Sequence, residues 1–198
     1  AEQLHGGFSS ADVCHLGSEH DKSPQNGAVT PISETDPIVL IVARIDAREG
    51  YKGHHELIAA WPSILRECPD AKLHIVGTGT GVNDLKQLAQ KLKVTQAVRF
   101  LGYLSDEELE AEYGRCRLFA MPSRGEGFGL VYLDAMRFAR PVIVSNCDAG
   151  QEIIEDGQTG YVVNPGHRNS LAEKVQTLLS NPEMAASMGN AALNHWRD

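Results

Sequence analysis

From Ile38 onward, short apolar runs alternate with longer amphipathic stretches, and this alternation constrains the fold more than any other feature. Such short runs are typical of buried parallel strands, whereas the stretches between them repeat their apolar residues at helical spacing. The runs occupy residues 38–43, 72–77, 98–102, 117–122, 141–145 and 160–163. Strands that alternate with helices predict an α/β fold, a doubly wound parallel sheet of about six strands with right-handed crossovers and helices on both faces.

Residues 1–37 differ from the rest, because Gly, Ser, Pro, Asn and Asp occur there without a sustained period. We therefore expect an irregular amino-terminal segment or interdomain remnant over 1–37 and one Rossmann-like domain over 38–198. A chain of 198 residues with 42% hydrophobic residues is long enough to bury the core of such a domain.

Charge and hydropathy narrow the classes of function. Lys and Arg number 18 against 26 Asp and Glu, which argues against a nucleic-acid backbone as the main partner. The longest apolar run, residues 38–43, is far shorter than the roughly 18 residues of a membrane span, and no basic region leads into an apolar one at the start. We expect a soluble, cytoplasmic protein.

Cysteines and histidines show no spacing typical of metal sites. The four cysteines, at positions 14, 68, 116 and 147, are scattered without a CxxC pair, which favours reduced thiols over a disulfide framework or a zinc site. His54 and His55 are adjacent, and adjacent residues on a helix point in different directions. We therefore predict no metal site.

The stretch over 121–145, MPSRGEGFGLVYLDAMRFARPVIVS, predicts strand, Gly-rich turn, helix and strand. Its glycines leave room for a ligand against the backbone, and the predicted helix over 128–139 begins with N–H groups that lack partners inside the helix. Such a turn favours an anion. The candidate binding positions are Gly127, Phe128, Gly129, Leu130 and Val131.

Two acids, Glu126 and Asp134, flank this turn eight positions apart. Eight residues of helix span about 12 Å, so the two carboxylates suit a ligand with hydroxyls at both ends and negative charge between them. A sugar joined through a diphosphate to a ribose has this pattern. The alternative is that Glu126 is an exposed cap and Asp134 an exposed helix position, although Asp is a poor choice inside a helix.

Loops after the other runs matter because doubly wound sheets bind ligands at the carboxyl ends of their strands. Residues 44–53 carry Arg44, Arg48 and Lys52, which suit a pyrophosphate but also fit a solvated loop. The glycine cluster over 77–81 is a weak signal, and Gly79 either approaches a ligand or lies in a plain turn.

The loop after the third run begins with Tyr103 and Leu104, which either form the wall of a base pocket or serve only as packing. Ser105 and Glu108 have the spacing of a capping box, so their simplest role is to start the next helix.

Together these segments resemble the donor-binding half of the retaining glycosyltransferases of family 4, which have the two-domain GT-B fold. The resemblance covers about residues 38–193, and it rests on five segments in the family's order. They are VARIDAREGYKGHHELIAAW, LHIVGTG, VRFLGYLSDEEL, PSRGEGFGLVYLDAMRFARPVIVS and GQEIIEDGQTGYVVNP.

The resemblance implies a role for each site residue. Arg44 and Lys52 would bind the donor diphosphate, together with the amides of Leu130 and Val131. Glu126 would contact the donor sugar near the reacting carbon, and Asp134 would bond the ribose hydroxyls. The base would lie against Tyr103, Leu104 and Asp106.

Two departures from the family pattern affect this site. Asp134 replaces the usual Glu, which keeps the carboxylate but shortens its reach by one methylene. Residues 148–150, Asp-Ala-Gly, stand where the family often has a Gly-Gly pair, which alters the expected contacts to the sugar.

The implied reaction transfers a sugar from a nucleoside diphosphate donor, a UDP- or GDP-sugar, to an acceptor hydroxyl with retention. Glu126, Arg44 and Lys52 would be its catalytic residues. No Asp-x-Asp occurs, so we expect no metal requirement and no cofactor. The amino-terminal acceptor domain would be missing, so the isolated domain would bind donor without turnover. The full enzyme could associate peripherally with the inner face of the membrane.

Three rival functions stay open. Another GT-B enzyme, such as a sugar-nucleotide epimerase, would form an epimer without acceptor. A non-catalytic nucleotide-sugar-binding or interaction module is the second rival, and absence of donor binding would favour an interaction module. A nicotinamide-dependent dehydrogenase fits least, because no glycine fingerprint follows the first run. The sequence does not identify the base, the sugar, the acceptor or the linkage.

Overall fold

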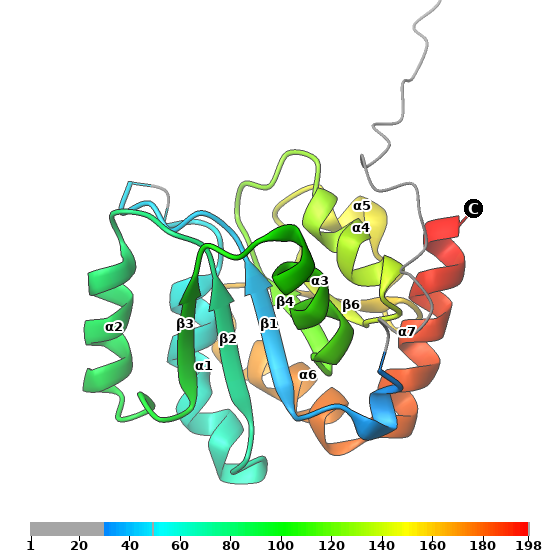
Figure 1. Ribbon diagram of the computed structural model, residues 1–198, viewed down its shortest axis with the longest axis horizontal. Coiled ribbons are helices and arrows are strands. Elements are labelled where there is room, and N and C mark those ends of the chain that lie inside the picture. Colours follow the sequence, from blue (N-terminus) through cyan, green and yellow to red (C-terminus); the bar gives the residue numbers. More distant parts are fainter. Residues whose placement is uncertain (1–29, 49, 198) are drawn as a thin grey trace, which may run out of the picture.

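Six parallel strands form a single sheet in the computed structural model, which describes residues 30–48 and 50–197 (Figure 1). The strand order is β3-β2-β1-β4-β5-β6. The α/β prediction of a doubly wound, six-stranded parallel sheet is confirmed. The strands are β1 (Ile38–Val42), β2 (Lys72–Val76), β3 (Val98–Gly102), β4 (Leu118–Met121), β5 (Val142–Ser145) and β6 (Gly160–Val163).

The order of the strands reverses beside β1. The chain moves outward from β1 through β2 to β3, and then returns to the other side of β1 with β4. The loops that leave β1 and β4 diverge from the same edge of the sheet, at the top of Figure 1. This switch point is where sheets of this kind bind ligands.

Helices cover both faces of the sheet. Figure 1 shows α1 and α6 behind the strands and α3 in front of them. The helices are α1 (His54–Glu67), α2 (Val82–Lys91), α3 (Asp106–Arg115), α4 (Leu130–Arg137), α5 (Gly150–Ile153), α6 (Arg168–Ser180) and α7 (Pro182–Arg197). Ser105 and Glu108 form the predicted capping box at the start of α3.

The fourth helix begins later than the sequence suggested. We predicted a helix from Phe128, but α4 starts at Leu130 because Gly129 has left-handed backbone angles, with φ 71°. A residue with positive φ cannot continue a right-handed helix, so the turn extends through Gly129.

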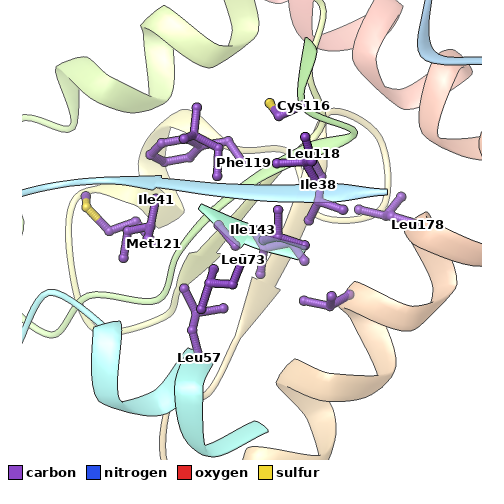
Figure 2. Packing of buried hydrophobic residues seen from close by; sticks show 14 of the residues in the cluster. Ile38, Ile41, Leu57, Leu73, Cys116, Leu118, Phe119, Met121, Ile143 and Leu178 are labelled. Atoms are coloured by element: carbon purple, nitrogen blue, oxygen red, sulfur yellow. The ribbon is translucent and has the colours of Figure 1, made fainter. Parts of the chain in front are cut away.

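The core lies on both sides of the sheet. Val39, Leu40 and Ile41 of β1 are fully buried, which explains why this strand reads as a continuous apolar run instead of an alternating one. Figure 2 shows Leu57 of α1 and Phe119 of β4 on opposite sides of β1. Each large side chain buried in this way contributes about 1.5–3 kcal/mol to folding.

Residues 30–37, the end of the segment that we expected to be irregular, pack against the domain. They include a short 3-10 helix, η1 (Ile32–Glu34), whose Ile32 is buried. The buried Arg117 donates to the carbonyl of Thr35 at 2.6 Å, and the buried Arg140 donates to the carbonyl of Thr30 at 2.6 Å. Residues 1–29 lie outside the described part of the chain.

Three cysteines, Cys68, Cys116 and Cys147, are free thiols, whereas Cys14 lies outside the described residues. Within residues 30–48 and 50–197, no helix combines the length and the apolarity that crossing a membrane requires.

Candidate functional site

A cavity of about 320 Å³ opens at the switch point between β1 and β4. It is formed by the ends of these two strands, the loop after β1, the Gly-rich turn and the start of α4. Its lining residues are Val42, Ala43, Arg44, Tyr51, Lys52, Met121, Glu126, Phe128, Leu130 and Val131. Six of the residues predicted for the site therefore share one cavity, namely Arg44, Lys52, Glu126, Phe128, Leu130 and Val131.

Lys52 reaches the cavity because the loop after β1 turns sharply at Gly53. Gly53 has φ 92°, and a Cβ atom there would come within 2.7 Å of the ring of Pro122. The close approach brings Lys52 Nζ to 2.7 Å from Glu126 Oε2 and to 5.0 Å from the centre of the Tyr51 ring. The first and fourth loops are thus joined by an ion pair inside the cavity.

Glu126 is held in place by more than this ion pair. Its Oε1 accepts a hydrogen bond from the Gly129 amide at 3.4 Å. Burial raises the pKa of Glu126, but the hydrogen bond and charge of Lys52, together with the amides of Gly129 and Phe128, outweigh burial and hold the pKa below its usual value. Glu126 is therefore ionised at neutral pH.

The lowered pKa predicts how this pair affects stability. Ionised Glu126 contributes stability above its unfolded-state pKa of about 4.3, and this contribution is lost as the pH falls through the folded-state pKa. Urea unfolding of the wild type and Glu126→Gln should therefore differ by a constant amount above about pH 6, on the order of 1 kcal/mol. The difference should shrink below about pH 4. A difference that persists unchanged to pH 3 would contradict the assignment.

The start of α4 presents backbone donors to the same cavity. The first amides of a helix have no partner within it and carry partial positive charge, and both Leu130 and Val131 line the cavity. Phe128 and Leu130 are exposed at its mouth. Lys52, Arg44 and these amides make one side of the cavity suitable for an anion such as a diphosphate.

Several other predicted site residues lie outside this cavity. Asp106 and Asp134 line a separate, small cavity of about 30 Å³ between α3 and α4, together with Tyr113 and Arg137. Tyr103 is 83% exposed after β3, and Leu104 next to it is half-buried. The roles assigned to Tyr103, Leu104, Asp106 and Asp134 remain predictions.

Two glycines that were predicted for the site, Gly79 and Gly127, differ in their surroundings. A Cβ atom at Gly79 would overlap the carbonyl of Ile45, so this glycine permits the loops after β1 and β2 to approach each other. Gly127 is exposed, and a Cβ atom there would meet nothing within 4 Å. Its place in the turn is compatible with the predicted ligand contact.

Sequence reasoning missed Tyr51 and Met121 as lining residues. The signal that could have indicated Tyr51 is its place directly before Lys52, because an aromatic side chain there can line the same pocket. Met121 ends β4, and only the topology shows that the end of this strand faces the loop after β1.

Comparison with known proteins decides the family. The family model described as Glycosyl transferases group 1 matches residues 23–195. The chain belongs to this family. It is therefore a glycosyltransferase domain of the GT-B type, as the sequence segments suggested.

This glycosyltransferase domain is similar in sequence to a named mannosyltransferase. The chain is 36% identical over 167 residues to the GDP-mannose-dependent alpha-(1-6)-phosphatidylinositol monomannoside mannosyltransferase of Mycolicibacterium smegmatis. That match covers 81% of this chain and 43% of the relative, so the chain spans less than half of the relative's length.

Solved structures of similar proteins share the fold. The C-terminal domain of the group 1 glycosyl transferase LpcC from Francisella tularensis has a TM-score of 0.70 at 26% identity, covering 80% of this chain and 82% of that one. Anabaena HepE, solved in complex with UDP, has a TM-score of 0.73 at 26% identity, covering 81% of this chain and 43% of that one.

Proposed function

We propose that this domain binds the nucleoside diphosphate sugar donor of a retaining, family 4 glycosyltransferase in the cavity between β1 and β4. The observation that carries the proposal is the meeting of Lys52, Glu126 and the start of α4 in one cavity at the switch point. The UDP bound to HepE and the GDP-mannose dependence of the mycobacterial relative support a nucleotide-sugar donor.

In this proposal the diphosphate lies between Arg44, Lys52 and the amides of Leu130 and Val131. As the bond from the anomeric carbon to the diphosphate breaks, negative charge accumulates on the leaving oxygen. The two cations and the helix amides stabilise that charge without a metal ion. The donor sugar extends toward Glu126, whose carboxylate faces the same cavity.

The configuration at the anomeric carbon is retained if the acceptor oxygen attacks from the same face of the sugar as the one from which the diphosphate departs. The new bond forms between the acceptor oxygen and the anomeric carbon, and the proton of the acceptor hydroxyl passes to the departing diphosphate. The acceptor would be held by a second domain, so this domain alone binds donor without transferring the sugar. Trapping a covalent sugar adduct on Glu126 in a two-domain enzyme would exclude this route.

The nucleoside would extend from the diphosphate toward α3, with the base beside Tyr103, Leu104 and Asp106. Its ribose would lie near Asp134 on α4. The shorter side chain of Asp predicts a weaker hold on the ribose hydroxyls than Glu would give.

Isothermal titration calorimetry tests the proposal on this chain. UDP, GDP and ADP are titrated first, followed by their glucose and mannose derivatives. We expect one base to bind clearly better than the others, and its sugar derivatives to compete with the free nucleotide for one site. If none of these compounds binds, the domain is a non-catalytic module and the proposal is wrong.

A further inference from the structure

Asp148 is a buried carboxylate directly behind the Glu126 turn. It lies in the loop between β5 and α5 and is only 8% exposed. A buried carboxylate is unfavourable unless its oxygens accept hydrogen bonds, so its partners should explain its presence.

Hydrogen bonds connect the Asp148 carboxylate to groups on both sides of the turn. Oδ1 accepts from the Gly150 amide at 2.9 Å, and Oδ2 lies 3.3 Å from the hydroxyl of Tyr132 on α4. Burial raises the pKa of Asp148, and the hydroxyl of Ser123 and the backbone amide of Glu126 partly offset this by stabilising the ionised carboxylate.

Two of these partners hold other parts of the turn. The Ser123 hydroxyl, which is fully buried, accepts a hydrogen bond from the Gly125 amide at 3.1 Å. The Tyr132 hydroxyl donates to the carbonyl of Met121 at 3.1 Å, where β4 ends. The network around Asp148 thus reaches the turn at its beginning and at its middle.

The main chain of Glu126 is held from the side on which Asp148 lies. Its carbonyl accepts a hydrogen bond from the amide of Ala149, the residue after Asp148, at 3.2 Å, and its amide stabilises the ionised Asp148 carboxylate. These contacts constrain the direction in which the Glu126 side chain leaves the backbone. The buried network therefore determines where the carboxylate enters the cavity.

We propose that Asp148 is a positioning residue that holds the Glu126 turn in the conformation that receives the donor sugar. It acts through the backbone of the turn, because its carboxylate is buried behind Glu126 and does not line the cavity. The inference rests on the proposed function, since it assigns the sugar end of the donor to Glu126. Asp148 then sets the affinity for the sugar without touching it.

The test compares affinities for a nucleoside diphosphate and for its sugar derivative by calorimetry on the whole chain. UDP with UDP-glucose and GDP with GDP-mannose are the probes. We expect Asp148→Asn to weaken binding of the sugar nucleotide by about 3- to 10-fold, the equivalent of one or two hydrogen bonds, and to change binding of the free nucleotide by less than about twofold. Asp70→Asn is the matched control. Asp70 is exposed in the turn before β2, so this substitution should change neither affinity.

If Asp148 has a purely structural role, Asp148→Asn lowers the melting temperature and either reduces the affinities for both ligands equally or changes neither affinity. Either result would overturn the inference. Ser123→Ala removes a single hydroxyl from the same network. It should likewise reduce the affinity for the sugar nucleotide more than the affinity for the free nucleotide. If Asp148→Asn does not fold, Ser123→Ala decides alone, and a wild-type ratio of the two affinities in that variant rejects the inference. A wild-type chain that binds neither probe pair would reject the proposed function itself.

Discussion

Replacing Lys52 with alanine is expected to weaken binding of nucleoside diphosphates and their sugar derivatives by about 10- to 100-fold. A hydrogen bond to a charged group is worth about 1.5–3 kcal/mol, and each 1.4 kcal/mol is a factor of ten in affinity. Lys52 is the compact charge closest to Glu126, and it projects into the cavity from a loop fixed by Gly53. Its loss also leaves Glu126 without its ion-pair partner, which adds repulsion toward a diphosphate.

Lys91→Ala serves as the matched control for this variant. Lys91 is exposed in the last turn of α2 and does not line the cavity, so the substitution removes the same charge and the same atoms elsewhere. Calorimetric titration of the preferred nucleotide should give a wild-type dissociation constant for Lys91→Ala. Equal affinities for wild type and Lys52→Ala would remove Lys52 from the site.

Gly77→Ala should lower the free energy of unfolding by about 2–6 kcal/mol. Gly77 has φ 136°, a conformation that side chains rarely adopt and that requires about 1–3 kcal/mol of strain. A Cβ atom there would also overlap the carbonyl of Ala43 at the end of β1, and relieving such a clash typically requires a similar amount. The loops after β1 and β2 would have to separate.

Gly50→Ala tests whether this effect belongs to the position and not to glycine replacement in general. A Cβ atom at Gly50 would meet nothing within 4 Å, so its unfolding free energy in urea should stay close to the wild-type value. A Gly77→Ala variant as stable as Gly50→Ala would show that the loops after β1 and β2 tolerate separation, and would contradict the expected loss of stability.

The central strands were predictable from sequence because β1, β4 and β5 are buried on both faces, which leaves short apolar runs with polar turns between them. Residues such as Lys52 and Glu126 were predictable because they lie in the loops that follow those runs, where a doubly wound sheet gathers its ligand contacts. Their mutual contact could not be read from sequence, since 74 positions separate them and only the sheet order joins their loops.

The glycines and Asp148 show where reading the sequence had too little information. A glycine required by backbone approach looks the same in sequence as one required by a ligand, and Gly79 has Ile45 as its close neighbour. Asp148 was noticed only as a departure from a family pattern. Its contacts with Ser123 and Tyr132 depend on the packing of β4, β5 and α4, which no local pattern encodes.

The most direct test of the account is an experimental structure of this domain with the nucleoside diphosphate that calorimetry selects. The account predicts that the diphosphate lies in the cavity between β1 and β4, with its oxygens within hydrogen-bond distance of Lys52 Nζ and of the amides of Leu130 and Val131. A nucleotide bound elsewhere on the domain, with that cavity unoccupied, would contradict it.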